Sequence, residues 1–198
     1  LRVVAGGSVG GAGVTVGSGA RLEGAGTITS AVRVRAGGTF APGVSAHAAV
    51  PSTATLTATG GVTVASGATY LAQLNGSSAG SFSTLAFAGT LDVSGSTLAV
   101  IPGPAFNPAG GDKFVIAANT GGSAVVGTFD GLAEGATGTT VGGGWTFQVT
   151  YLADATGNLN AGNSIMLYNF AVVPEPATVL GVAAAGLGLA GLARRRRT

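Results

Sequence analysis

Four aspartates in the second half of the chain have the spacing that comes nearest to a catalytic pattern. Asp92, Asp112, Asp130 and Asp154 are separated by 20, 18 and 24 residues. If they lay on successive turns of a repeated β structure, their carboxylates would form a ladder, and two carboxylates within about 10 Å can cleave a glycosidic bond. However, Asp92 lies within a strand pattern, Asp112 precedes one, and the other two follow one. Because these local positions differ, we expect solvated carboxylates at corners rather than a ladder.

Other catalytic and metal-binding patterns are sparse. His47 is the only histidine and there is no cysteine, which excludes disulfides, thiol catalysis and a metal cluster built on histidine or thiolate. No Gly-x-Ser-x-Gly sequence accompanies His47, so we expect no catalytic triad. Residues 154–160 (DATGNLN) offer oxygen atoms for calcium, but their pattern favours an Asx turn. We therefore expect no catalytic residue, no metal site and no cofactor.

The segments that would position such residues contain a repeat. Residues 14–22, 32–40 and 62–70 fit the pattern V-x-V-x-x-G-x-x-[LFY], and residues 91–98 form a copy one residue shorter. The two valines face the same side of a strand, and the glycine can adopt a positive φ at a corner. The closing Leu, Phe or Tyr then starts the next strand with an inward side chain. One such unit cannot bury its apolar face alone, whereas a stack of units can.

Composition supports a stacked β structure. The chain has 37 glycines among 198 residues, and 46% of its residues are apolar, which favours strands and tight turns over disorder. We predict an all-β fold with a parallel β-helix (solenoid) over residues 1–170. An antiparallel sandwich over residues 81–170 is the alternative. Because Leu1 starts inside a β pattern, we interpret the chain as an N-terminally truncated fragment of a longer precursor.

Three longer apolar segments lie in the later half, at residues 113–117, 145–151 and 164–170. The last two alternate between apolar and polar residues, which is typical of strands with one wet face. They fit either terminal turns of the solenoid or a hairpin that caps its open end.

The body of the chain resembles a known repeat family. Residues 37–43 (GGTFAPG), the repeats above and residues 127–151 are similar to the autotransporter-associated β-strand repeats of bacterial surface proteins. The resemblance covers most of residues 1–170. It implies a right-handed parallel β-helix that lies outside the cell.

The composition changes after residue 170. Pro174, Glu175 and Pro176 form a rigid, extended triplet, and residues 177–193 carry no charge. As a helix, the uncharged segment would be about 25 Å long, at the short limit for crossing a bilayer core of about 30 Å. The arginines after it would stay on the cytoplasmic side. We predict a linker at 171–176 and a single transmembrane helix with a cytoplasmic tail at 177–198. Its membrane residues are Val179, Leu180, Val182, Leu187, Leu189 and Leu192, and its stop-transfer residues are Arg194, Arg195, Arg196 and Arg197.

The basic isoelectric point comes from this tail. Four of the nine basic residues lie at 194–197, and the rest of the chain without Glu175 holds five basic and six acidic residues. The isoelectric point of about 9.5 therefore does not indicate a nucleic-acid-binding surface, and we expect no nucleic-acid partner.

The order of the tail resembles the PEP-CTERM sorting signal of Gram-negative bacteria. A Pro-Glu-Pro triplet, a short apolar segment and a terminal arginine cluster follow one another in residues 173–198. The resemblance implies that a membrane-embedded exosortase recognises Pro174, Glu175 and Pro176 and cleaves there. The body would be held at the inner membrane before cleavage and would then reach the cell surface or an extracellular polysaccharide matrix.

The sequence therefore predicts a non-enzymatic exported protein with a sorting signal. One alternative is a protein that binds or modifies polysaccharide, with the aspartates as acids and Trp145, Tyr151 and Tyr70 as stacking platforms. Another is an adhesin, which would expose an apolar or aromatic stripe.

Overall fold

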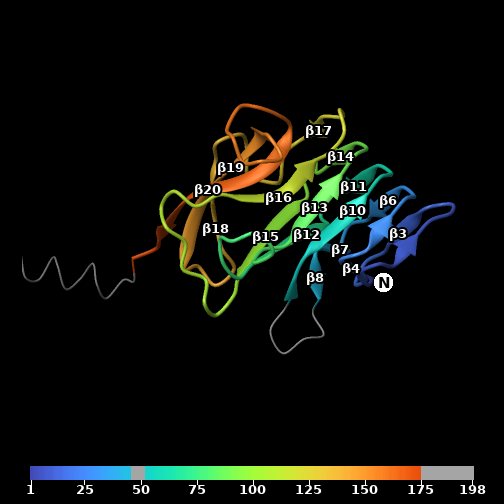
Figure 1. Cartoon of the computed structure of the whole chain (residues 1–198), viewed down its shortest axis with the longest axis horizontal. Coiled ribbons are helices and arrows are strands. Elements are labelled where there is room, and N and C mark those ends of the chain that lie inside the picture. The colour runs from blue at the N-terminus through green and yellow to red at the C-terminus, as the bar shows by residue number, and fades with distance from the viewer. Residues whose placement is uncertain (46–51, 175–198) are drawn as a thin grey trace, which may run out of the picture.

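The computed structural model describes residues 1–45 and 52–174, and these residues form strands and turns. Fifteen strands are arranged in five rungs of three, stacked along one axis (Figure 1). The rungs, in chain order, are β1 (Arg2–Val3), β2 (Ser8–Val9) and β3 (Val14–Val16); β4 (Arg21–Gly24), β5 (Thr27–Ile28) and β6 (Val32–Val34); β7 (Thr39–Pro42), β10 (Thr55–Ala58) and β11 (Val62–Val64); β12 (Thr69–Leu74), β13 (Thr84–Phe87) and β14 (Leu91–Asp92); and β15 (Thr97–Pro102), β16 (Phe114–Asn119) and β17 (Val125–Val126).

Stacking produces three parallel sheets. The first sheet has the order β1-β4-β7-β12-β15, the second contains β2-β5-β10-β13-β16, and the third has the order β3-β6-β11-β14-β17. All pairs between rungs are parallel, which is the arrangement of a β-solenoid. The all-β, solenoid-like body is thus confirmed, and its right-handed sense stays a prediction.

The sequence repeat sets the register of the rungs. Val14, Val32, Val62 and Leu91 are successive partners in the third sheet. The closing residues of the repeat, Leu22, Phe40, Tyr70 and Leu98, are partners in the first sheet. The corner glycines of the four copies, Gly19, Gly37, Gly67 and Gly95, all have φ between 67° and 75°. Each copy therefore supplies a strand, a left-handed corner and the start of the next strand.

The core lies inside the stack. The second valine of the first three copies is buried, as are the closing Leu22, Phe40 and Tyr70. Burial of each such side chain contributes about 1.5–3 kcal/mol, so the repeated columns supply most of the driving force. The buried hydroxyl of Tyr70 donates a hydrogen bond of 2.9 Å to the carbonyl of Ile116, which prevents an unsatisfied polar group.

An inserted hairpin lengthens the third rung. Strands β8 (Val44–Ser45) and β9 (Ser52–Thr53) pair antiparallel between β7 and β10. Val44 packs with Ala41, Leu71 and Ile101 in a second apolar cluster, separate from the core inside the rungs. The insertion accounts for the spacing of 30 residues between the second and third copies of the repeat.

Three antiparallel strands cap the C-terminal end. They are β18 (Thr137–Thr139), β19 (Trp145–Ala153) and β20 (Ser164–Val172), and they extend the second sheet in the order β18-β19-β20-β16. The rings of Phe106, Phe114, Phe147 and Phe170 pack together beneath them. Of the two expectations for the last segments, the capping hairpin is confirmed. Residues 81–126 continue the solenoid, so a sandwich over residues 81–170 is wrong.

Candidate functional site

The predicted acids do not form a ladder. Asp92 lies on β14, where its partners in the neighbouring rungs are Thr63 and Val126. Its carboxylate accepts hydrogen bonds from the backbone N–H of Ser94 (3.0 Å) and from the hydroxyl of Ser94 (2.6 Å). No acid therefore stacks on Asp92, and its carboxylate stabilises the turn after its own strand.

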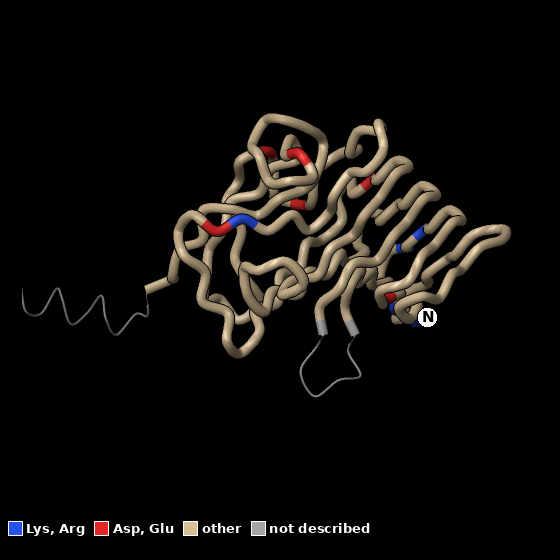
Figure 2. The backbone as a smooth tube through the Cα atoms, in the orientation of Figure 1, with Lys and Arg blue, Asp and Glu red and all other residues tan. Residues whose placement is uncertain are grey.

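Asp112 and Asp130 lie in separate surroundings. The Asp112 carboxylate accepts a hydrogen bond of 3.0 Å from the N–H of Ala109, whereas Asp130 follows Phe129 and its own N–H donates to the carbonyl of Ser96. Figure 2 shows the basic residues mainly in the first rungs and the acidic residues mainly toward the cap. In the ranges 1–45 and 52–174, no group of three or more His, Cys, Asp or Glu residues could hold a metal ion.

The Asp154 loop is an Asx turn, as expected. The Asp154 carboxylate accepts hydrogen bonds from the backbone N–H groups of Thr156 and Asn158, from the Thr156 hydroxyl and from the Asn158 amide, at 2.7–2.9 Å. The donors on Asn158 and then Thr156 hold the pKa of this carboxyl well below its usual range. The oxygens that calcium would need already accept hydrogen bonds from the loop itself.

Two of the three predicted stacking platforms are buried. Tyr70 has an exposed fraction of 0% and lies in the core. Tyr151 is 7% exposed, and its hydroxyl donates to the carbonyl of Leu132 while accepting from the N–H of Phe129. Burial raises the pKa of Tyr151 to about 12. Neither ring is available to a sugar, so these two assignments are wrong, and Trp145 alone is partly exposed.

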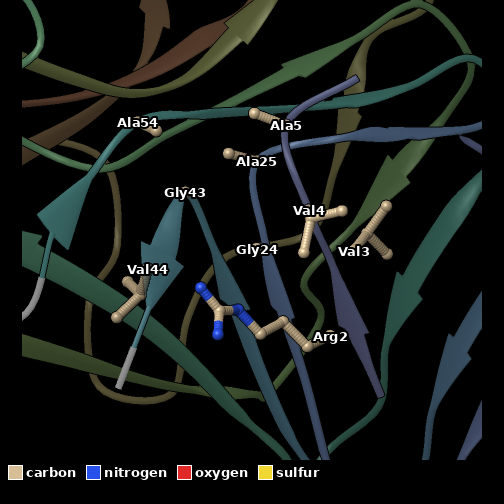
Figure 3. A pocket seen from close by; sticks show the side chains of 9 residues that line it. All are labelled: Arg2, Val3, Val4, Ala5, Gly24, Ala25, Gly43, Val44 and Ala54. Carbon is tan, nitrogen blue, oxygen red and sulfur yellow. The ribbon is translucent and has the colours of Figure 1, made fainter. Parts of the chain in front are cut away.

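Two hollows lie on the described surface, and neither gathers catalytic groups. One of about 220 Å³ lies at the first rung, beside the base of the inserted hairpin. Figure 3 shows Arg2, the only charged residue that lines it, extending from β1 in the direction of Val44. The other, of about 310 Å³, contains Lys113, whose ammonium donates a hydrogen bond of 3.2 Å to the carbonyl of Gly157.

The chain leaves the cap directly after β20. Val172 ends the strand opposite Trp145, and the N–H of Val173 still donates a hydrogen bond of 3.1 Å to the carbonyl of Gly144. Pro174 follows at once and is exposed. β20 thus runs two residues beyond the expected end of the body at residue 170, because Ala171 and Val172 pair with Thr146 and Trp145 at the start of β19.

Residues 172–197 match the PEP-CTERM protein-sorting motif. The chain therefore carries the sorting signal of exported proteins that an exosortase processes. The sorting motif begins at the last residue of β20, so the folded cap and the signal share Val172. No curated protein and no solved structure matches the chain.

Several predicted residues lie outside the described ranges. They are His47, Glu175, Pro176, the membrane residues at 179–192 and the arginines at 194–197. Within the residues that the structure describes, there is no helix with the length and apolarity needed to span a membrane.

Proposed function

We propose that this chain is a non-enzymatic exported protein whose β body acts at the cell surface or in an extracellular polysaccharide matrix. One observation carries the proposal: the PEP-CTERM sorting motif begins at Val172, the last residue of the last strand of the body. In this proposal the functional residues at the C-terminus are a substrate on which another protein acts. The partner is a membrane-embedded exosortase.

The chemistry of the motif suits such processing. Pro174 and Pro176 fix their own φ angles and restrict the residues before them, so the triplet favours an extended backbone. Enzymes and receptors that bind peptides often hold them extended. The uncharged residues 177–193 would hold the precursor in the inner membrane, and Arg194 to Arg197 would keep its end in the cytoplasm until cleavage.

The described body supports a scaffold role. Asp92, Asp112 and Asp154 use their carboxylates to stabilise their own turns. Its aromatic side chains lie largely in the core, and stacked parallel rungs form extended outer surfaces of the kind on which repeat proteins bind partners. The resemblance to autotransporter-associated repeats, which points in the same direction, stays a prediction.

Fractionation and mass spectrometry of the C-terminus test the proposal. In a host with an exosortase, we expect an extracellular form that ends at or near Pro174 to Pro176. In a matched host without the enzyme, we expect the uncleaved chain in the inner-membrane fraction. In the host with an exosortase, Glu175→Ala should therefore stay uncleaved in the inner-membrane fraction. An extracellular form that still carries Arg194 to Arg197 would contradict the proposal.

A further inference from the structure

An uncharged apolar patch lies where the chain leaves the cap. We call Val141, Trp145 and Val172 the exit patch. Val141 is 55% and Val172 is 62% exposed, and Trp145 is partly exposed. No charged side chain occurs in residues 135–153 or 155–174. Single exposed apolar residues are common on protein surfaces, so the significance of these three depends on their place at the exit of the chain.

Strand pairing holds the exit patch together. Val172 and Trp145 are direct partners in the antiparallel pair of β20 and β19, so their side chains lie on the same face. The N–H of Thr140 donates to the carbonyl of Trp145, and the Thr140 hydroxyl accepts from the Trp145 N–H. Val141 follows Thr140 in the turn between β18 and β19. Trp145 and Val172 therefore share a face. Val141 lies at the same end of the cap, where its N–H donates a hydrogen bond of 2.8 Å to the carbonyl of Val100 on β15.

The exit patch is continuous with the hydrophobic core. Trp145 packs on Phe106 with ring centres 5.9 Å apart, and Phe106 packs on the buried Phe170. Val172 lies two residues after Phe170 on the same strand, yet it is largely uncovered. The side of β20 that faces the core is thus exposed to solvent at Val172, where the sorting motif begins.

The same end of β20 has an unpaired edge. β20 pairs with β16 only as far as Leu167, whose partner is Phe114. From residue 168 to residue 172, β20 has β19 on one side and, among the described residues, no strand on the other. Asn169 has a φ of 51° and the pairing with β19 shifts register beside it, so the regular part of this edge is residues 170–172. A short edge of this kind can accept a strand from a partner, which is a common mode of peptide binding.

Chain length brings this end of the body close to the membrane. Five residues separate Val173 from Val179, the first residue of the proposed membrane segment. Even when fully extended, this stretch spans only about 20 Å. The headgroup layer takes about 5–7 Å of that distance. Because Val173 is hydrogen-bonded to the cap, this end of the cap cannot lie further than this from the membrane surface at which an embedded enzyme works.

We propose that the exit patch and the unpaired edge of β20 at residues 168–172 form a docking surface for the exosortase. This inference rests on the proposed function above. Recognition then extends from the Pro-Glu-Pro triplet onto the folded cap, because an enzyme that holds the triplet has the cap within contact distance. Val172 ends β20 and the N–H of Val173 is still hydrogen-bonded to the cap, so the folded body reaches the residue before the triplet.

Substitution of an exposed residue tests the docking surface. In cells that contain the exosortase, Val141→Asp should slow cleavage at least five-fold in a pulse-chase experiment. Leu152→Asp is the matched control, since Leu152 is 46% exposed in the cap but lies outside the exit patch. It should change the rate less than two-fold. Equal rates for Val141→Asp and the unchanged chain would overturn the inference.

Photo-crosslinking keeps the test valid if Val141→Asp disturbs folding. A photoreactive amino acid is placed at position 141 or 152 of the full chain, in cells with a catalytically inactive exosortase. We expect a covalent adduct with the exosortase from position 141 and little from position 152. An adduct from position 141 that contains only lipid or a second copy of this chain would overturn the inference.

Glu175→Ala separates the two proposals. Loss of cleavage in Glu175→Ala, together with a normal rate in Val141→Asp and no exosortase adduct, would overturn the docking surface alone. Normal cleavage of Glu175→Ala would overturn the proposed function and this inference with it. Loss of cleavage in Glu175→Ala, slow cleavage in Val141→Asp and the adduct from position 141 would support both.

Discussion

In the solenoid, the sequence repeat determines which side chains are neighbours. In the cap, the pairing of three antiparallel strands that are not repeated determines them. Val14, Val32 and Val62 meet because each lies at the same place in its rung. Phe114, Phe147 and Phe170 meet because β20 folds back antiparallel on β16 and β19. The first arrangement can be extended rung by rung, and the second ends the stack.

The difference explains why apolar residues remain exposed at the end of the stack. Each inner rung buries its faces against similar neighbours, and its outer side chains are mostly polar, such as Thr15, Arg33 and Thr63. The cap has no further rung to cover it, so apolar residues such as Val141 and Val172 remain exposed. The end of a stack is where a solenoid either requires a polar cover or offers a site to a partner.

Removing a central ring of the cap should have the largest effect. Phe170 contacts Phe106, Phe114 and Phe147 at ring-centre distances of 5.0–5.8 Å. Phe170→Ala should lower the free energy of unfolding by about 3–5 kcal/mol, because it leaves a cavity in the aromatic cluster. Chemical denaturation measures this. The exposed Val126→Ala in the last rung, the control, should cost less than about 0.5 kcal/mol. A loss below about 1 kcal/mol for Phe170→Ala would show that the cap does not depend on this cluster.

Two neighbouring glycines test how tightly the rungs stack. A Cβ on Gly60 would lie 2.5 Å from the carbonyl oxygen of Ser30 in the rung before, whereas a Cβ on Gly61 would have its nearest contact at 3.7 Å. Gly60→Ala should therefore cost about 1–3 kcal/mol. Gly61→Ala should be neutral or stabilise by up to about 1 kcal/mol through the unfolded chain. Thermal unfolding compares the two, and equal midpoints would contradict close stacking at this corner.

The repeated part of the fold could be predicted from the sequence, and the unique part only in outline. The valine and glycine positions of the repeat gave the register of the third sheet and the positive φ of Gly37 and Gly67. Of the fifth rung, β17 was not predicted, because Val125 and Val126 are adjacent and do not alternate with polar residues. The hairpin of β8 and β9 was visible only as the longer spacing between the second and third copies of the repeat, because a spacing does not show which structure the inserted residues form.

The residues of the candidate site could likewise be predicted only where they are contiguous in the sequence. The assignment of Tyr70 and Tyr151 as platforms failed because their exposure depends on which face of the strand is covered, and Tyr70 occupies the inward position of the repeat. The sorting motif was readable because its three parts are contiguous. The exit patch could not be predicted from the sequence, because Val141, Trp145 and Val172 come to one end of the cap only through the pairing of β18, β19 and β20.

Alkaline pH should weaken the cap by a moderate amount. Burial raises the pKa of Tyr151 to about 12 from its ordinary value of 10.0, with a smaller contribution from the Glu134 carboxylate. A raised folded-state pKa gives stability that is complete below pH 10 and is lost as the pH rises toward 12. The free energy of unfolding should fall by about 2 kcal/mol in this range from Tyr151 alone.

Tyr151→Phe is the control for this pH dependence. It should be less stable than the unchanged chain at pH 8, because Phe129 and Leu132 lose a hydrogen-bond partner. The difference between the two proteins should narrow between pH 10 and pH 12. Denaturation curves that stay parallel across this range would show that Tyr151 does not ionise on unfolding.

The smallest effect is expected at the Asp154 loop, on the outside of the cap. Its hydrogen bonds from Asn158 and Thr156 hold the pKa of Asp154 below its ordinary value, so its contribution is present above about pH 4 and is lost as the pH falls further. Because the carboxylate is fully exposed, its loss should loosen the loop without unfolding the cap. The amide resonances of Thr156 and Asn158 should therefore shift together well below pH 4, whereas those of β19 and β20 should not move in that step. Asp154→Ala should release the two loop amides at neutral pH and leave the rate of exosortase cleavage unchanged, since the loop lies outside the exit patch. A change in that rate would mean that the docking surface on the cap extends further than the end where β20 leaves it.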